Sequence, residues 1–211
     1  LLLSDLAGIP GDQLTSLETE TTAHHQAGRF LAALQQVPLD GLDPMPPEEA
    51  IRRRLAGWLG RAEVMQRKGP RPGAVLDADL LASARAVIDP ACFAGATRVQ
   101  AHRDFRPGNW LLEGPQLRVL DFGHARVDLR WVDLSKLATG PWRRAPALQT
   151  GFLAGFGVAL ADQDRAQLRS LCALHGLATA VWAAQRGDVK ARAEGEDILR
   201  WCAAPGASLR S

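Results

Sequence analysis

Residues 102–109 have the sequence HRDFRPGN, and residues 121–123 have the sequence DFG. Within these two segments stand an aspartate, Asp104, an amide five positions later, Asn109, and a second aspartate, Asp121. A carboxylate that orients and deprotonates a hydroxyl, with an amide and a carboxylate that hold a metal ion, are the groups that phosphoryl transfer requires. The pattern therefore predicts a phosphotransferase. The alternative, a surface hairpin with a polar loop, would not require this order and spacing.

The segments around these residues have the patterns of short strands. Residues 97–101 predict a strand that leads into the loop, and residues 109–113 and 117–120 predict a hairpin with a Gly-Pro turn. Such a hairpin holds Asn109 and Asp121 at its two ends, so we expect both side chains to emerge on the same side. Mg²⁺ takes one or two protein oxygens together with phosphates and water. The pair is therefore a candidate Mg²⁺ site.

The other residues of the loop have different expected roles. We expect Asp104 to be the catalytic base, because positioning matters more than basicity in a loose transition state; a loop-capping Asx residue is the alternative. His102 is expected to anchor the loop by hydrogen bonds. Arg106 can reach the transferring phosphoryl group, and we assign it a catalytic role. Arg103 and Arg106 could equally be solvated loop cations.

At these residues the chain resembles the protein-kinase-like superfamily, and within it the aminoglycoside phosphotransferase family. Two distances favour that family over the protein kinases. Asp121 is followed only twelve residues later by Asp133, whereas a protein kinase needs a longer activation segment there. Residues 1–8 are similar to the family's hinge, and about a hundred residues separate them from Asp104, more than a protein kinase uses.

The resemblance implies roles for individual residues. Asn109 and Asp121 would hold Mg²⁺. Leu111 and Leu120 would form the apolar floor beneath adenine, and Asp133 would brace the catalytic loop through backbone hydrogen bonds. Core packing or helix capping is the alternative role of these last three residues.

In the hinge segment, backbone groups of Leu3, Ser4 and Asp5 would meet the adenine. The chain departs from the family's usual pattern at two positions. The family usually has Gly where this chain has Arg103, and often an acidic residue where it has Gly123. At both positions the chain has the residue that is typical of protein kinases. The departures bear on the choice of acceptor more than on the chemistry of transfer.

The expected fold is α+β and mostly helical: a protein-kinase-like C-terminal lobe with a small active-site β-hairpin, the N-terminal lobe being absent. Residues 1–8 would be a hinge remnant and residues 9–211 the lobe. Within the lobe we expect an inserted helical subdomain at 9–90, the catalytic and metal-binding core at 97–134, and C-terminal helices at 135–211. The sequence holds no Gly-rich loop and no strand lysine for the nucleotide phosphates. We therefore expect a fragment that by itself binds Mg-ATP weakly and transfers phosphate poorly.

Helix signals flank the active-site segment. Thr15 and Glu18 form a capping-box pattern for a helix that would end at Pro38, and residues 46–49 are expected to begin a second helix. Further helices are expected at residues 77–87, 131–138, 145–156, 162–186 and 188–203.

These observations predict an ATP-dependent O-phosphotransferase that moves the γ-phosphate to a hydroxyl of a small molecule, with ATP and Mg²⁺ as cofactors. The expected acceptor is an aminoglycoside or a cyclic-peptide antibiotic, so the enzyme would confer antibiotic resistance. Carboxylates and tryptophans of the last helices would suit a polycationic acceptor, although interspersed arginines leave a solvated helix face as the alternative. The competing functions are a metabolic kinase of the same fold, acting on choline, homoserine or a sugar, and a non-catalytic kinase-like binding protein.

The composition bounds the partners. The net charge is +2 over 211 residues, with no dense basic run containing aromatics, so a nucleic-acid partner is not expected. No apolar stretch approaches the length that spans a membrane, so a membrane partner is not expected either. Cys92, Cys172 and Cys202 fit reduced thiols of a cytoplasmic protein better than a disulfide framework or a metal site. The acceptor, the hydroxyl position, the choice of ATP or GTP, and the oligomeric state stay open.

Overall fold

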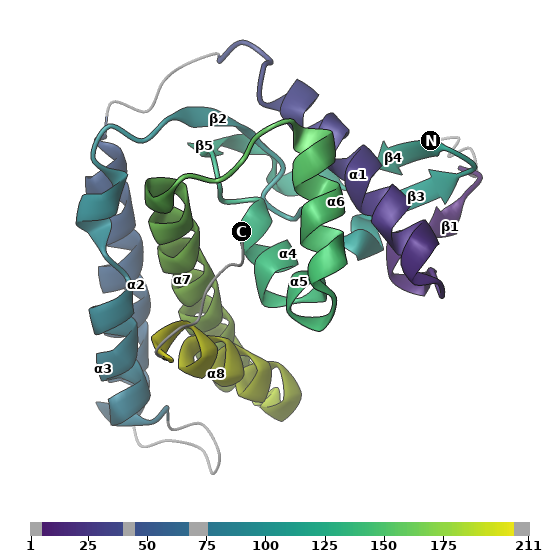
Figure 1. Cartoon of the computed structure of the whole chain (residues 1–211). Helices are drawn as coiled ribbons and strands as arrows, with labels where there is room; N and C mark the ends of the chain where they lie inside the picture. The colour runs from purple at the N-terminus through teal and green to yellow at the C-terminus, as the bar shows by residue number, and fades with distance from the viewer. Residues whose placement is uncertain (1–5, 40–44, 68–75, 205–211) are drawn as a thin grey trace. The chain divides into compact units, whose positions relative to one another are not determined.

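The structure is a computed structural model that describes residues 6–39, 45–67 and 76–204 (Figure 1). The helices in these ranges are α1 (Leu17–Leu34), α2 (Pro47–Arg67), α3 (Ala78–Val87), α4 (Leu134–Thr139), α5 (Pro141–Arg144), α6 (Pro146–Phe156), α7 (Asp162–Arg186) and α8 (Val189–Ala203). The strands are β1 (Ile9–Pro10), β2 (Arg98–Ala101), β3 (Trp110–Glu113), β4 (Gln116–Val119) and β5 (Arg126–Leu129). The prediction of a mostly helical α+β fold is confirmed.

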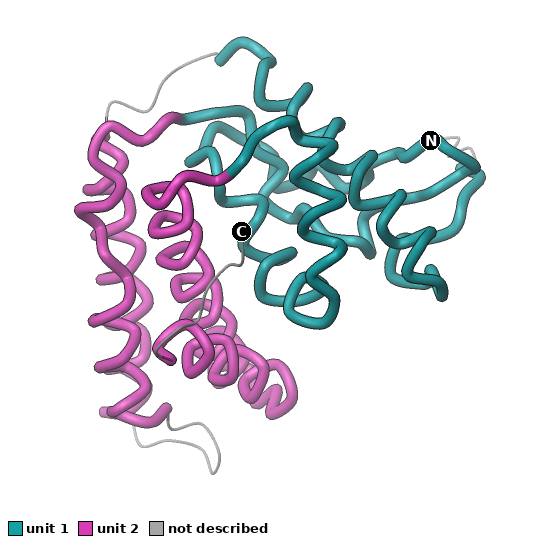
Figure 2. Tube along the Cα trace, viewed as in Figure 1, with its two compact units in different colours: residues 1–42, 98–159 teal, residues 43–97, 160–211 magenta. Residues whose placement is uncertain are grey.

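The chain forms two compact units, which Figure 2 shows in different colours. The first unit combines residues 1–42 with residues 98–159, and the second combines residues 43–97 with residues 160–211. The first long helix, α1, thus belongs with the active-site strands and not with α2 and α3. The subdomain boundaries expected from the sequence, near residues 90 and 134, differ from those of the two units. The expected subdivision stays a prediction.

Two small antiparallel sheets lie in the first unit. β3 and β4 form the predicted hairpin, with Trp110 opposite Val119 and Glu113 opposite Gln116, and β1 adds a third strand beside β3. The predicted strand before the loop is present as β2, and it pairs with β5. β5 was not predicted, because its four residues include a charged side chain, Asp128, that points into the protein and hides the apolar alternation.

Helices α1 and α6 cross at close range in the first unit, and glycines lie at the crossing. A Cβ atom added to Gly28 would lie 2.2 Å from the backbone oxygen of Phe152. One added to Gly155 would lie 1.9 Å from the backbone oxygen of His25. Both distances are far inside van der Waals contact, so the helix backbones approach one another as only glycine permits. This crossing brings Phe152 of α6 to the catalytic loop.

The helix boundaries differ from the predicted ones at several points. The N-cap of α1 is Ser16, whose Oγ accepts the N–H of Thr19 at 3.1 Å, so the predicted capping box from Thr15 is wrong by one residue. The helix expected at 131–138 is shorter and begins only at Leu134, and Gly140 separates it from α5. α2 begins at Pro47, within the start predicted at residues 46–49.

The second unit consists of α2, α3, α7 and α8 with a short 3₁₀ turn. α7 and α8 pack through another close approach, since a Cβ added to Gly195 would lie 2.4 Å from the backbone nitrogen of Ala180. α2 and α3 pack on α7, and α3 also contacts α8. Within the described residues, none of the helices combines the length and apolarity that a bilayer-spanning segment needs.

Candidate active site

The start of the catalytic loop is fixed by Asp133, the residue directly before α4. Its two carboxylate oxygens accept the backbone N–H groups of His102, at 2.9 Å, and Arg103, at 2.6 Å. Asp133 is buried, and burial raises the pKa of its carboxyl, an effect that the two backbone donors oppose. A buried acceptor that serves two loop amides holds the loop against the first turn of α4.

His102 connects the catalytic loop with the strand end that precedes Asp121. Its Nε2 atom donates to the backbone oxygen of Leu120 at 2.8 Å, and its Nδ1 atom accepts the backbone N–H of Asp104 at 3.3 Å. The ring is fully buried and lies against Phe122, with 4.6 Å between ring centroids. These contacts are those of a structural anchor, and they fix the ring in one tautomer.

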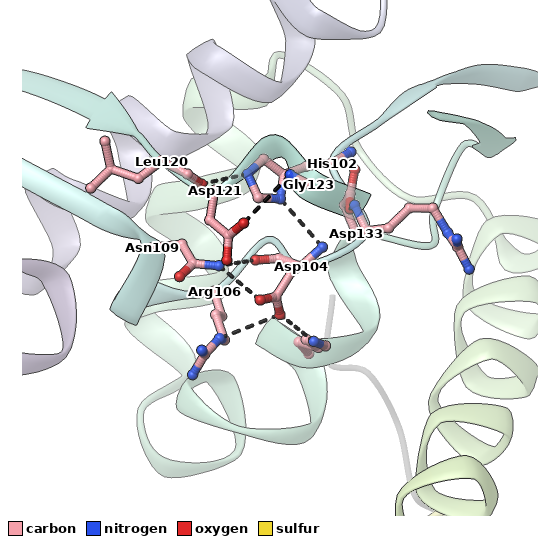
Figure 3. A network of polar contacts seen from close by, with 10 residues as sticks. His102, Asp104, Arg106, Asn109, Leu120, Asp121, Gly123 and Asp133 are labelled. Carbon is pink, nitrogen blue, oxygen red and sulfur yellow. Dashed lines mark hydrogen bonds and ion pairs between the residues drawn. The ribbon is translucent and has the colours of Figure 1, made fainter. Parts of the chain in front are cut away.

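The carboxylate of Asp104 lies at the centre of the polar network in Figure 3. Nδ2 of Asn109 donates to its Oδ2 atom at 2.9 Å and to its backbone oxygen at 2.8 Å. Its Oδ1 atom forms ion pairs with Nζ of Lys136 and with Nε of Arg106, the latter at 3.3 Å. Burial raises the pKa of Asp104, but Lys136, Asn109 and Arg106 outweigh it and bring the pKa below the usual value. The carboxylate is therefore ionised at neutral pH.

Asn109 directly precedes β3 and Asp121 follows Leu120 after β4, so both lie at the open end of the hairpin. The hairpin is closed between them, since the N–H of Leu120 donates to the backbone oxygen of Asn109 at 2.9 Å. In Figure 3 both side chains lie beside Asp104. Because the amide nitrogen of Asn109 faces Asp104, its amide oxygen points away from that carboxylate and can accept a cation. The sequence-based expectation that the two side chains share one side agrees with this geometry.

The donors at this place suit Mg²⁺. An amide oxygen from Asn109 and a carboxylate from Asp121 are hard oxygen ligands, and Mg²⁺ is normally held by one or two such groups with phosphates and water completing the shell. The Oδ1 atom of Asp121 also accepts the N–H of Gly123, at 3.4 Å. Among the described residues there is no cluster of three His, Cys, Asp or Glu side chains that could hold a metal ion alone.

Two site residues have an unusual backbone conformation. Arg103, with φ of 66°, and Asp121, with φ of 60°, are the non-glycine residues with positive φ in the part of the chain that the structure describes. This region costs an ordinary side chain about 1–2 kcal/mol and is often found at functional sites. At Arg103 a contact compensates, because its Nε atom lies 2.8 Å from Oδ2 of the fully buried Asp128 on β5.

A cluster of aromatic side chains packs around Phe105 of the catalytic loop. Phe105, next to the candidate base, is fully buried and lies 5.1 Å from Trp110 and 6.3 Å from Phe152, measured between ring centroids. Phe30 of α1 stacks on the same ring at 6.3 Å. Aromatic pairs at these distances add stability beyond the area that they bury. The cluster therefore holds the catalytic loop in a fixed position.

The residues expected near adenine are only partly placed. Leu111 lies on β3 opposite Arg118, Leu120 follows β4 directly, and both are half-buried. Leu3, Ser4 and Asp5 lie outside the described residues. Hydrogen bonds and ion pairs thus link Asp104, Arg106, Asn109, His102 and Asp133. Asp121, which accepts the N–H of Gly123, is drawn close to them in Figure 3. The hinge contacts stay predictions.

A hollow of about 540 Å³ lies between α1 and the β3–β4 turn of the first unit and contains none of the predicted site residues. Another hollow, of about 380 Å³, adjoins the catalytic loop. Its walls include Asp12, Glu20, Arg106, Gly108 and Arg144, so charged groups of both signs line it.

Sequence reasoning missed two residues of the site. Lys136 contacts the candidate base, and Asp128 contacts the loop through Arg103. The sequence holds one signal for the first: Lys136 is the single lysine of the first unit, in a chain whose basic residues are otherwise almost all arginine. Asp128 has no comparable signal.

The sequence matches the model of a family described as the phosphotransferase enzyme family, over residues 1–171. Comparison with the curated proteins found no match. Several solved structures are similar in fold. One is a choline/ethanolamine kinase family protein from Mesorhizobium loti, with a TM-score of 0.62 and 16% identity. Another is a thermostable mutant of aminoglycoside phosphotransferase APH(4)-Ia, with a TM-score of 0.67 and 16% identity. A third is the macrolide 2′-phosphotransferase MphH from Brachybacterium faecium, with a TM-score of 0.56 and 18% identity.

These structures are longer than the chain. The alignments cover 88%, 93% and 92% of this chain, and 62%, 69% and 67% of the three structures in the same order. Identities of 16% to 18% establish a shared fold, whereas the family match extends over most of the sequence, including residues 102–123. The chain belongs to the phosphotransferase enzyme family.

Proposed function

We propose that this chain carries the catalytic centre of a kinase that transfers the γ-phosphate of ATP to a hydroxyl group of a small molecule. The observation that carries the proposal is the convergence of Asp104, Asn109 and Asp121 at one end of a hairpin (Figure 3). A base, an amide oxygen and a second carboxylate are the groups that phosphoryl transfer needs. The family match supports the same reaction class.

In the proposed reaction Asp104 binds the acceptor hydroxyl. The hydroxyl oxygen attacks the γ-phosphorus, its proton passes to the Asp104 carboxylate, and the bond from phosphorus to the β–γ bridging oxygen breaks, so that ADP leaves with the electron pair. Arg106, which already lies 3.3 Å from Oδ1 of Asp104, offers a guanidinium to the transferring group. Asp133 holds the start of the loop through two backbone N–H groups, and the His102 ring joins it to the backbone of Leu120.

Asn109 and Asp121 would hold Mg²⁺, which when bound offsets the charge of the nucleotide phosphates. The αL backbone of Asp121, with φ of 60°, directs its carboxylate in a way that an extended backbone would not. Leu111 and Leu120 would lie beneath the adenine, with the hinge residues Leu3, Ser4 and Asp5 at its edge.

We infer an antibiotic acceptor, an aminoglycoside, a macrolide or a cyclic peptide. Similar folds include the gentamicin complex of APH(2″)-IIa, with a TM-score of 0.61 and 15% identity over 93% of this chain and 68% of that one, and the macrolide enzyme described above. The hollow beside the catalytic loop has two carboxylates in its wall, and that of Glu20 forms an ion pair with Arg144. The carboxylate of Asp12 would suit an amine or hydroxyl group of the acceptor. We place the enzyme in the cytoplasm, where ATP is available.

The second candidate is a metabolic kinase, favoured by the similarity to a choline/ethanolamine kinase family protein. One experiment separates the two. The protein is expressed from its complete gene and assayed for nucleotide consumption with Mg-ATP or Mg-GTP and a panel of aminoglycosides, macrolides, cyclic-peptide antibiotics, choline, homoserine and sugars. Turnover with an antibiotic, together with resistance of a sensitive host, supports the first candidate. Turnover with choline, homoserine or a sugar and no resistance supports the second.

A further inference from the structure

Lys136 extends from the first turn of α4 to the candidate base. Its ammonium group forms an ion pair with Oδ1 of Asp104. The side chain of Lys136 is 32% exposed and that of Asp104 is 14% exposed, so the pair is partly shielded from water. Such a pair is stronger than one on an open surface. Lys136 lies three residues after Asp133, so the same helix start fixes both the loop and this cation.

The geometry also limits where a substrate hydroxyl can bind. A carboxylate offers about four acceptor positions, two on each oxygen. On Asp104, Lys136 and Arg106 both face Oδ1, and Asn109 donates to Oδ2. These three donors leave one acceptor position, on Oδ2, for the hydroxyl of a substrate.

We propose that Lys136 is a positioning residue of the proposed phosphotransferase: with Arg106 it occupies Oδ1 of Asp104, so that Oδ2 receives the proton of the acceptor hydroxyl. Lys136 acts through the carboxylate, which it holds turned in one direction. This inference rests on the proposed function.

The groups around Asp104 make Lys136 the dominant partner. Charged groups reach the carboxylate from α4, in Lys136, and from the loop itself, in Arg106. The ring of His102 meets only the backbone N–H of Asp104. Arg106 is more than half exposed and lies at 3.3 Å, so its effect is weakened by water.

The test uses three variants of the protein expressed from its complete gene. Lys136→Met removes the charge and keeps the length, Lys136→Arg keeps the charge, and Lys190→Met is the matched control on the exposed face of α8. For each variant kcat and KM are measured between pH 4.5 and 9 with the acceptor that the panel identifies. Unfolding midpoints and circular dichroism establish that each variant is folded.

We expect Lys136→Met to lower kcat/KM at least tenfold at pH 7, part of the roughly 10²- to 10⁴-fold that a positioned base contributes. The KM for the nucleotide should change less than kcat. Lys136→Arg should keep most of the activity, because it keeps the charge that faces Asp104, and Lys190→Met should behave as the unchanged protein does.

Two negative results are distinguishable. If the unchanged protein turns over an acceptor and Lys136→Met keeps its kcat, the inference is overturned and the proposed function stands. If the unchanged protein turns over none of the acceptors, the proposed function is refuted and the inference falls with it. Should Lys136→Met not fold, Lys136→Gln replaces it, and an unchanged kcat in that variant overturns the inference in the same way.

Discussion

The side-chain amide of Asn109 donates to both the backbone oxygen and the carboxylate of Asp104, at 2.8 Å and 2.9 Å. One residue thereby fixes the candidate base and turns its own amide oxygen away from it. The candidate metal site and the candidate base are thus joined through a single buried side chain. A change at either residue should be felt at the other.

Replacement of Asn109 by Ala should affect both roles. The variant loses two hydrogen bonds to Asp104 and one candidate metal ligand. We expect kcat to fall by roughly 10²-fold or more, and the Mg²⁺ concentration for half-maximal turnover to rise, because positioning is lost together with a ligand. Turnover measured against Mg²⁺ concentration tests this. An unchanged Mg²⁺ dependence would argue against Asn109 as a ligand.

Asp133→Asn should destabilise the loop with little change in shape. An amide has only one accepting oxygen, so one of the two N–H groups from His102 and Arg103 would lose its partner and face an NH₂ group. An unmet buried donor costs about 1–3 kcal/mol in the free energy of unfolding. Denaturant unfolding measures the loss, and Glu194→Gln on the exposed face of α8 is the control, expected to change the free energy by less than about 0.5 kcal/mol. Equal stabilities of the two variants would contradict the bracing role.

Arg103→Gly sets two effects against each other. Glycine removes the strain of φ at 66°, about 1–2 kcal/mol, but it leaves the buried Asp128 without this cation, which costs about 3–5 kcal/mol. The single variant should therefore be less stable by about 1–4 kcal/mol. Adding Asp128→Asn removes the buried charge and should restore much of the loss. The free energies of unfolding of the unchanged protein, the two single variants and the double variant give the coupling energy between Arg103 and Asp128. A coupling energy near zero would show that the ion pair contributes nothing to stability.

The pH dependence of turnover should reflect the lowered pKa of Asp104. Burial alone would raise this pKa, but the contacts with Lys136, Asn109 and Arg106 lower it below the usual value of 3.8. A base works in its ionised form, above its pKa, so kcat/KM should stay level as the pH falls from 7 to about 5. A carboxyl with a lowered pKa also stabilises the folded state above its unfolded pKa, and this stability is lost as the pH falls through the folded pKa.

A pH profile of kcat/KM, with unfolding followed in parallel, checks this expectation. An acidic limb above about pH 5.5 in a folded protein, due to a group of the free enzyme, would contradict the assignment of Asp104 as the base.

Much of the candidate site could be predicted from the sequence because it is local. Residues 102–109 and the hairpin that follows specify their own geometry, so Asp104, Asn109 and Asp121 were found without knowledge of the packing. Lys136 and Asp128 were not found, because their contacts depend on how α4 and β5 dock on the loop. A single sequence gives little information on which elements pack together, and a four-residue strand such as β5 gives the least.

Helix ends show the same limit on a smaller scale. Thr15 and Ser16 are both good N-cap residues, and the sequence does not decide between neighbours. The structure selects Ser16, whose hydroxyl receives the N–H of Thr19. The close crossing of α1 and α6 was equally hidden, because Gly28 and Gly155 acquire their meaning only when the two helices meet.

The most direct test of the central claim compares the unchanged protein with Asp104→Asn, both expressed from the complete gene, in transfer of labelled γ-phosphate to the acceptor. Nucleotide affinity is measured on the same samples. The account predicts that transfer falls by about 10³-fold or more, while the nucleotide Kd changes by less than about threefold, because asparagine keeps the shape but cannot take the proton. Transfer by Asp104→Asn within about tenfold of the unchanged protein would contradict the claim that Asp104 is the catalytic base.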